Sequence, residues 1–110
     1  MNEKRVLQTI GLCSKAGKAA SGEFQCEDAV RSRTARVVLL ASDASGNTIK
    51  KFQNKCAFYH IPIFTLFCNK EELGRAIGKE KRSCVAVTDA GLAGVLLKSL
   101  EEAPEGNQPL

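Results

Sequence analysis

Aromatic residues are scarce in this sequence, and long apolar runs are missing. The 110 residues include five Phe, one Tyr and no Trp, so we expect a core built mainly from Val, Leu, Ile and Ala. No segment approaches the roughly eighteen consecutive apolar residues of a transmembrane helix. The N-terminus, MNEKRVLQTIG, lacks the apolar stretch and the cleavage site of a signal peptide. We therefore expect a cytoplasmic protein that has no contact with membranes.

The five cysteines are odd in number and are never spaced as C-x-x-C. Disulfide frameworks and zinc sites both depend on paired or closely spaced cysteines, so the sequence predicts neither. We interpret the cysteines as small buried apolar side chains in a reducing compartment, and nothing in the sequence supports a lone reactive thiol. They are Cys13, Cys26, Cys56, Cys68 and Cys84.

Catalytic motifs are missing as well. His60 is the only histidine, and no carboxylate or cysteine stands beside it. The segment GLCSKAGKAA fails the phosphate-loop pattern, because Gly11 and Gly17 are one residue too far apart and Ala19 replaces the Ser or Thr that binds magnesium. Asp43 lacks the acidic pair that a phosphoacceptor site needs. We predict no enzymatic activity, no catalytic residues, no cofactor and no metal site.

Charge is distributed unevenly along the chain. Residues 1–100 hold 16 Lys and Arg against 9 Asp and Glu, a net charge of +7, whereas residues 101–110 hold three acids and no base. We predict one folded domain over residues 1–100 and an acidic, disordered tail over residues 101–110. A small basic domain suits binding to a phosphate backbone, because Lys and Arg side chains near phosphates release condensed counterions.

Apolar residues alternate between helical spacing and short continuous runs. Helices are expected over residues 2–17, 23–33, 49–59, 69–78 and 92–100, and strands over residues 18–22, 37–41, 61–67 and 83–88. The run VVLLA is continuous, which is typical of a strand buried on both faces. This alternation predicts an α/β sandwich with helices on both faces of a sheet of about four strands.

Polar residues stand where helices are expected to begin. Asn69, followed three residues later by Glu72, forms a capping-box pattern, and Ser21 is a candidate N-cap for the helix over residues 23–33. Asp43 follows a central strand at its carboxyl end, where ligands gather in open α/β sheets. A helix cap or a buried ion-pair partner is the simpler role for this aspartate.

Four segments of the sequence together carry a family resemblance. They are IGLCSKAGKAASGE, ARVVLLASDASGNT, KCAFYHIPIF and NKEELGRAIGKEKRSCVAVTD. The most specific part is the pattern formed by Lys70, Leu73, Gly74, Ala76 and Gly78 with the strand that follows. Over nearly the whole chain, residues 3–97, the sequence resembles the ribosomal protein L7Ae/L30e superfamily of kink-turn RNA-binding proteins, in its bacterial YlxQ-like branch.

The resemblance implies a three-layer α/β/α sandwich with a mixed sheet, no enzymatic activity and a structured ribosomal or messenger RNA as ligand. In this superfamily the kink-turn is gripped by the N-terminal turn of the second helix, here residues 22–28, and by the loop before the last strand, here residues 79–82. A helix N-terminus presents unpaired N–H groups to phosphates, and a sharply bent RNA exposes base edges that a straight A-form helix hides. We expect a monomer that associates with the ribosome or with translation.

The helix start departs from the superfamily pattern at two positions. Gly22 and Gln25 match it, but Phe24 replaces a residue that hydrogen-bonds a base, and Asp28 replaces a lysine that faces the RNA. Phe24 either stacks on a splayed base or joins the core, as an apolar residue on a helix more often does. The alternative function is therefore a protein-interaction module that keeps the fold and has lost specific RNA recognition.

The resemblance and the basic composition together predict a set of RNA-binding residues. Gln25 and Phe24 are expected to contact bases, the backbone at Gly22 to approach phosphate, and the basic side chains to add salt-sensitive affinity. Asp43 is expected to orient the helix start from behind. The predicted RNA-binding residues are Lys18, Gly22, Glu23, Phe24, Gln25, Lys79, Glu80, Lys81 and Arg82.

Overall fold

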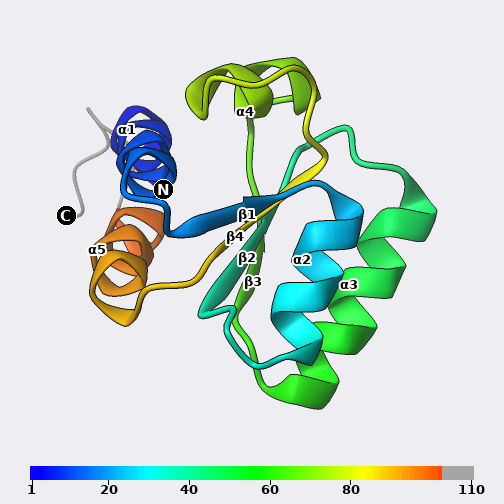
Figure 1. Ribbon diagram of the computed structural model, residues 1–110. Helices are drawn as coiled ribbons and strands as arrows, with labels where there is room; N and C mark the ends of the chain where they lie inside the picture. The colour runs from blue at the N-terminus through cyan, green and yellow to red at the C-terminus, as the bar shows by residue number, and fades with distance from the viewer. Residues whose placement is uncertain (103–110) are drawn as a thin grey trace, which may run out of the picture.

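A mixed sheet of four short strands lies at the centre of the computed structural model, which describes residues 1–102 (Figure 1). The strands are β1 (Ala19–Ser21), β2 (Val37–Leu40), β3 (Ile63–Thr65) and β4 (Cys84–Val87), in the spatial order β1-β4-β2-β3. β4 runs antiparallel to β1 and β2, whereas β2 and β3 are parallel. The mixed sheet that the resemblance implies is confirmed.

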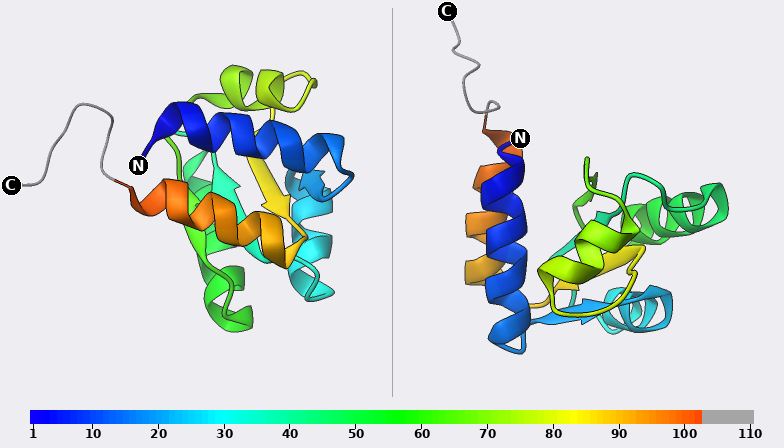
Figure 2. Two further views of the ribbon diagram at one scale, coloured as in Figure 1. Left: turned by 90° about the vertical axis from the view of Figure 1, so that its left-hand side faces the viewer. Right: turned by 90° about the horizontal axis from the view of Figure 1, so that it is seen from above.

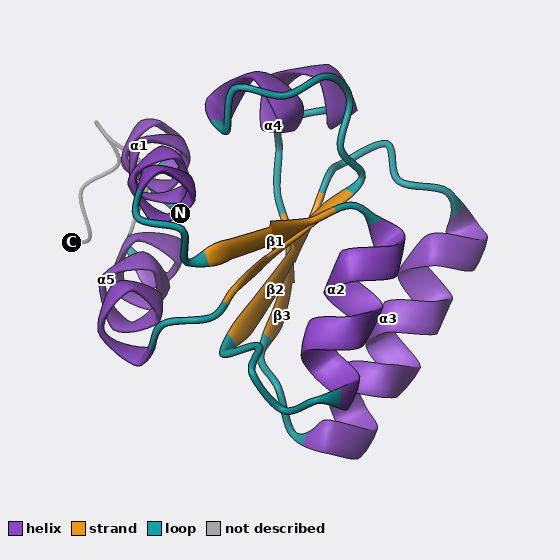
Figure 3. Ribbon diagram, in the orientation of Figure 1, coloured by secondary structure: helices purple, strands orange, loops and turns teal. Residues whose placement is uncertain are grey.

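Helices cover both faces of this sheet (Figures 1 and 3). α1 (Glu3–Lys15) and α5 (Ala90–Glu101) lie on one face, and α2 (Glu23–Arg31) and α3 (Gly46–Tyr59) lie on the other. The short α4 (Lys70–Ala76) lies over one end of the sheet, as the view from above shows (Figure 2). The predicted three-layer α/β/α sandwich is confirmed. Within residues 1–102, no helix is long and apolar enough to cross a membrane.

The central strand β2 divides the core into two halves by simple alternation. Val37 and Leu39 pack among side chains from α1, α4 and α5, whereas Val38 and Leu40 pack among those from α2 and α3. All four side chains are completely buried, as the run VVLLA predicts. Burying each leucine contributes roughly 2 kcal/mol relative to leaving it exposed.

Most predicted boundaries differ from the structure by one to three residues, and two of the differences change an interpretation. The strand expected over residues 61–67 is only Ile63–Thr65, and Phe67 beyond it is 68% exposed. β3 is an edge strand, so its register ends where its one partner, β2, ends. Ser21 is not the N-cap of α2, because its backbone is paired with Val85 in the sheet and Gly22 takes the cap position.

Left-handed residues that are not glycine follow α2 and α3: Arg33 lies just beyond the C-cap of α2, and His60 is the C-cap of α3. Arg33 has a φ of 65° and His60 a φ of 58°, in a region where an L side chain crowds the backbone at a cost of roughly 1–2 kcal/mol. The Arg33 N–H donates to the Val30 carbonyl at 3.1 Å, and the Ile61 N–H donates to the Cys56 carbonyl at 2.8 Å. Both helix ends lie at the end of the sheet where β2 and β3 begin (Figure 1).

All five cysteines are free and buried, which confirms their interpretation as small apolar side chains. Burial raises the pKa of the Cys56 thiol and of the Cys68 thiol to about 11, and it also raises the pKa of Cys13. These thiols are therefore protonated and unreactive at neutral pH. Among the residues that the structure describes, no three His, Cys, Asp or Glu side chains are grouped as a metal site requires.

The last described residues lie beside the N-terminus. The Met1 amino group donates a hydrogen bond to the Glu102 carbonyl, and Arg5 Nη1 lies 3.0 Å from a carboxylate oxygen of Glu102. Glu101 is the last residue of α5. Glu101 and Glu102 of the predicted tail are therefore among the described residues. The rest of the predicted acidic tail, residues 103–110, lies outside the described residues.

Candidate functional site

Helix α2 begins without a side-chain cap. Its N-cap, Gly22, has φ 86° and ψ 159°, a conformation essentially restricted to glycine. The N–H groups of Glu23, Phe24 and Gln25 precede the first intrahelical bond, which the Cys26 N–H donates to the Gly22 carbonyl at 3.0 Å. Within residues 1–102, each of the other four helices donates a backbone N–H of its first turn to the side chain of its N-cap residue. The α2 start therefore presents open donors and the positive end of a helix dipole.

The Glu23 carboxylate is held by α3. Thr48 Oγ1 donates to Glu23 Oε1 at 2.6 Å. Thr48 Oγ1 in turn accepts from the Ser45 hydroxyl at 2.9 Å. The Thr48 N–H donates to Ser45 Oγ at 3.2 Å, which caps α3. Glu23, one of the predicted RNA-binding residues, thus fixes the start of α2 against the start of α3 through its side chain.

Lysines of α3 neutralise the acids of α2. Lys51 Nζ lies 3.3 Å from Glu23 Oε1 and 2.7 Å from Glu27 Oε1, and Lys55 Nζ lies 3.9 Å from Glu27 Oε2. The Thr48 hydroxyl, and after it Lys51, hold the pKa of Glu23 below its ordinary value. Glu27, and after it Glu23, raise the pKa of Lys51. A phosphate approaching the α2 start consequently meets little repulsion from these carboxylates.

Phe24 and Gln25 project from the first turn of α2 into solvent. Phe24 is 81% exposed, and Gln25 is exposed as well. The buried face of α2 consists of Cys26, Ala29 and Val30. The expectation that Phe24 joins the core is therefore wrong, because helical spacing places the core face on residues 26, 29 and 30 and turns residue 24 away. Its ring is free to stack on a base.

The loop over residues 79–82 lies directly on α4. The Lys79 N–H donates to the Gly74 carbonyl at 2.8 Å, and the Arg82 N–H donates to the Lys70 carbonyl at 3.0 Å. A Cβ atom on Gly74 would lie 1.6 Å from the carbonyl oxygen of Glu80. Only glycine permits this approach, so Gly74, already prominent in the sequence pattern, sets the position of the loop.

Arg82 joins this loop to the start of α2. Its Nε donates to Ser21 Oγ at 3.1 Å, and its Nη1 donates to the Lys81 carbonyl at 2.9 Å. A shallow groove, here named the α2–loop groove, lies at this junction. Six of the predicted RNA-binding residues line it together with Ser21 and Ser83, namely Gly22, Glu23, Phe24, Gln25, Lys81 and Arg82.

The other predicted RNA-binding residues lie outside this groove. Lys79 and Glu80 line an adjoining depression that shares Lys81 and Arg82 with it. Lys18 lies at the opposite end of β1, where its carbonyl accepts from the Thr88 N–H at 2.9 Å. At about 3.3 Å per residue, that position is roughly 13 Å along the strand from Gly22. The structure therefore does not bring Lys18 to the groove.

Asp43, predicted to orient the start of α2, instead contacts the start of α4. Its Oδ1 accepts from the Lys70 N–H at 2.8 Å. The predicted capping box is confirmed at the same helix, because Asn69 Oδ1 accepts from the Glu72 N–H at 2.9 Å and Glu72 Oε1 accepts from the Asn69 N–H at 3.0 Å. The aspartate thus acts as a helix cap from another segment, the simpler role that the sequence offered.

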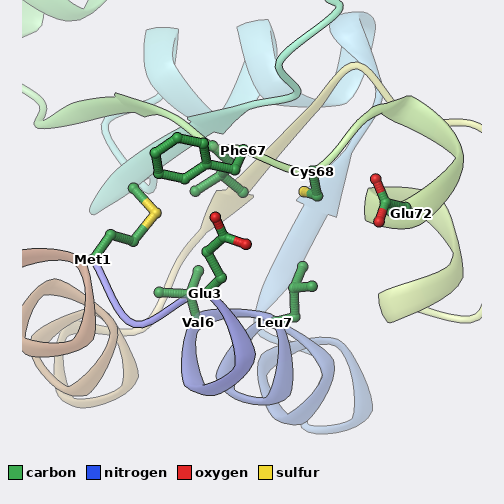
Figure 4. Close-up of a pocket in the computed structure, with 8 residues that line it drawn as sticks. Met1, Glu3, Val6, Leu7, Phe67, Cys68 and Glu72 are labelled. Atoms are coloured by element: carbon green, nitrogen blue, oxygen red, sulfur yellow. The ribbon is translucent and has the colours of Figure 1, made fainter. Parts of the chain in front are cut away.

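A small cavity beside α1 has different chemistry (Figure 4). Its volume is about 80 Å³, and it lies between the first turns of α1 and the segment that follows β3, with Met1 and Phe67 on its walls. The side chains of Glu3 and Glu72 also line it. Two carboxylates at the rim oppose the binding of an anion such as phosphate.

Comparison with known proteins identifies the family to which this architecture belongs. Residues 4–97 match the group described as the "Ribosomal protein L7Ae/L30e/S12e/Gadd45 family". The chain belongs to this family. The matched range includes every residue of the α2–loop groove. The resemblance drawn from the four sequence segments is confirmed.

Two curated relatives in the L7Ae family carry the name "RNA-binding protein YlxQ". The relative from Bacillus subtilis (strain 168) is 44% identical over 92 residues, which cover 84% of this chain and 91% of the relative. The relative from Enterococcus faecium is 36% identical over 105 residues, which cover 96% of each chain. The similarity to the YlxQ-like branch is therefore confirmed.

Solved structures share the fold. A protein of unknown function from Bacillus halodurans C superposes with a TM-score of 0.85 and 38% identity, covering 89% of this chain and 98% of its own. The "Giardia lamblia 15.5kD RNA binding protein" superposes with a TM-score of 0.78 over 91% of this chain and 88% of its own. Its identity is 18%, so this second likeness concerns the fold alone.

Several residues that build the site in this L7Ae-family chain were missed by sequence reasoning. Ser45 carried a usable signal, because a serine just before a helix is a common N-cap. Thr48 and Lys51 carried none, since their partner Glu23 lies 25 or more positions away in the sequence. Gly74 was recognised as part of a pattern, but its contact with Glu80 is visible only in the structure.

Proposed function

We propose that this protein binds a structured RNA with a kink-turn-like bend through the α2–loop groove. The observation that carries the proposal is the uncapped start of α2 beside the Arg82 guanidinium, which together offer backbone and side-chain donors to phosphate. Membership of the L7Ae family and the names of the two YlxQ relatives support RNA as the ligand. The basic composition of residues 1–100 supports it as well.

Each part of the groove has a distinct role in this proposal. The Phe24 ring stacks on a base that the bend has turned out of the helix, and the Gln25 amide hydrogen-bonds a base edge. Lys81 and Arg82 hold the phosphate backbone on the opposite wall of the groove. Glu23 takes no direct part in RNA contact and keeps the α2 start in place through Thr48.

The broader setting follows from the same proposal. We place the protein in the cytoplasm as a monomer that binds ribosomal or messenger RNA in association with translation. Membership of the L7Ae family supports binding without catalysis.

The affinity for a labelled kink-turn RNA, measured across a salt series, tests the proposal. The comparison RNA has the same length, with its bend-forming bases changed. We expect tight binding of the bent RNA only, and Gln25→Ala should weaken it. Lys81→Gln should make the log–log salt dependence shallower by about one, whereas Lys4→Gln on the distant α1 should not. Equal, weak and steeply salt-dependent binding of both RNAs would contradict specific recognition.

Asp28 offers a test in the opposite direction. It occupies the position where the superfamily pattern has an RNA-facing lysine, and its Oδ1 lies 3.1 Å from Arg31 Nη2. Asp28→Lys removes a repulsive charge and adds an attractive one, so the affinity for the bent RNA should rise. If the affinity falls or stays constant while a nuclease-resistant protein partner co-purifies with the chain, the groove serves protein recognition instead.

A further inference from the structure

A second depression lies at the end of the sheet opposite to the α2–loop groove. It is formed where α2 and α3 end and where β2 and β3 begin, at the bottom of Figure 1. Arg33, Arg36, Tyr59 and His60 line it, together with Ala35, Ile61 and Pro62. None of its lining residues belongs to the groove described above.

The basic side chains of this depression are free of carboxylate partners. Arg33 and Arg36 are exposed, and within residues 1–102 no ion pair involves either of them. The nearest acid on α2 is Asp28, which pairs with Arg31. Asp89, beyond the end of β4, is engaged as the cap of α5. The two guanidinium groups can therefore meet an external anion.

Lys18 adds a further positive charge at the same end of the sheet. The Thr88 N–H donates to the Lys18 carbonyl at 2.9 Å, and the Arg36 N–H donates to the Val87 carbonyl at 2.7 Å. Both contacts lie at the carboxyl end of β4, so Lys18 and Arg36 share one edge of the molecule. The lysine that does not reach the α2–loop groove thus lies at the same end of the sheet as this second depression, without lining it.

Aromatic rings stand next to these charges. The Arg33 guanidinium carbon lies 5.3 Å from the centroid of the Tyr59 ring, a cation–π geometry. Phe58 meets Tyr59 edge to face, with 4.9 Å between ring centroids, and Phe58 is itself 74% exposed. The exposed Phe58 ring thus contacts the Tyr59 ring that Arg33 overlies. Proteins hold single-stranded nucleic acid with such combinations of exposed rings and basic side chains.

The backbone at this end gives an independent indication. Arg33 and His60 both adopt positive φ, 65° and 58°, at the ends of α2 and α3. Glycine is the residue that this conformation favours, yet both positions carry side chains that can donate to an anion, and both line the same depression. Side chains placed at strained positions cluster where they have a function.

We propose that Arg33, Arg36 and Phe58 form a second RNA-contacting surface, which holds a single-stranded segment that extends from the bent RNA in the first groove. The proposal extends the proposed function to a second site. RNA is favoured over an acidic protein segment, because the exposed Phe58 ring adds base stacking to the positive charge of Arg33 and Arg36. The longest dimension of the molecule is 40 Å, so one RNA strand of moderate length can reach both surfaces.

Binding of three labelled RNAs tests this second surface. They are a minimal kink-turn RNA, the same RNA with a single-stranded extension long enough to cross the molecule, and the extension alone. The test variant is Arg33→Gly/Arg36→Gln, in which glycine also relieves the positive φ at residue 33, so thermal unfolding should show an intact fold. The charge-matched control is Lys4→Gln/Lys98→Gln, on α1 and α5.

The extended RNA should bind the test variant about threefold to tenfold more weakly, with a log–log salt slope shallower by roughly 1.4, because two single-strand phosphate contacts are lost. Phe58→Ala should weaken the extended RNA by about fivefold or more through lost stacking. Binding of the minimal RNA should be unchanged in both variants, and the control should match the wild type throughout.

Two results would overturn the second surface. One is an affinity for the extended RNA that the test variant leaves unchanged, and the other is displacement of the extension by poly-glutamate as effectively as by RNA of the same length. The test separates this inference from the proposed function. If the wild type shows no preference for the bent RNA but the extension alone still depends on Arg33 and Arg36, the first groove fails and the second surface stands.

Discussion

The starts of α2 and α4 lie near one end of the sheet, but only the α4 start has its N–H groups capped by side chains. At α4, Asn69 and Glu72 cap each other, and Asp43 accepts from the Lys70 N–H. At α2, Gly22 carries no side chain, and no N–H of the first turn donates to a capping side chain. The α4 start is satisfied within the protein, whereas the α2 start leaves its donors to solvent or a ligand.

The difference separates residues that stabilise the fold from residues that remain available to a ligand. The capped α4 serves as a platform, because the loop over residues 79–82 rests on Gly74. The open α2 start serves as the receiving side, with Phe24 and Gln25 exposed beside it. Perturbing the platform should therefore reduce stability, whereas replacing the exposed Phe24 or Gln25 side chain should change RNA binding alone.

The largest effect is expected from Gly74→Ala in the platform. The added Cβ would lie 1.6 Å from the Glu80 carbonyl oxygen, so the loop must move away, and the free energy of unfolding in urea should fall by about 3 kcal/mol. Gly94→Ala in α5 is the matched control, because no atom lies within 4 Å of its added Cβ. That change should raise stability by up to about 1 kcal/mol through helix propensity. Equal effects of the two substitutions would contradict the claim that the loop over residues 79–82 rests on Gly74.

The next effect concerns the open side. Phe24→Ala should weaken binding of the bent RNA by about 2 kcal/mol, the stacking energy of one base on an aromatic ring. The ring is 81% exposed, so the free energy of unfolding should stay within about 0.5 kcal/mol of the wild type. Phe67→Ala, which removes another exposed ring, is the control and should leave RNA binding unchanged. A loss of stability with intact RNA binding would show that Phe24 stabilises the fold and does not contact RNA.

A smaller effect is expected from the cap of α4. Asn69→Ala removes the bond from the Glu72 N–H and should lower the free energy of unfolding by about 1 kcal/mol. Affinity for the bent RNA, measured at a temperature where the variant is fully folded, should not change. An affinity loss as large as that of Phe24→Ala would show that the two helix starts do not differ in role.

The smallest effect is a pH dependence at Glu23. Its pKa is held below the ordinary value of 4.5, chiefly by the Thr48 hydroxyl. The unfolded state therefore binds the proton first, and the stabilisation is fully present above pH 4.5 and lost as pH falls below it. The loss should be less than about 1 kcal/mol, because the carboxylate is partly exposed. Glu23→Gln should lack this acid loss in urea unfolding, whereas Glu80→Gln should show it as the wild type does.

Local signals in the sequence predicted the frame of this molecule well. The run VVLLA indicated a strand buried on both faces, and Asn69 with Glu72 indicated a capped helix, because each signal depends on neighbours within a few residues. The pairing of Gly22 and Gln25 with the loop over residues 79–82 came from the family resemblance rather than from local chemistry. The structure brings Gly22, Gln25 and part of that loop into one groove.

Contacts between distant segments could not be predicted. Asp43 reaches Lys70 across 27 positions, and Thr48 reaches Glu23 across 25, and no local pattern specifies such partners. Ser21 was a plausible cap, but its pairing in the sheet shifts the cap to the next residue. The start of α2 was predicted at the correct residue, but the face that packs on the sheet consists of Cys26, Ala29 and Val30, and helical spacing turns Phe24 away from it.

The most direct test of the account is an NMR titration of the isotope-labelled protein with the bent RNA. The backbone amide signals of Glu23, Phe24 and Gln25 should shift strongly, because these N–H groups face the ligand. The amide signals of Lys70 and Glu72, which are already bonded within the protein, should change little. Strong shifts at the start of α4 with none at the start of α2 would contradict the account.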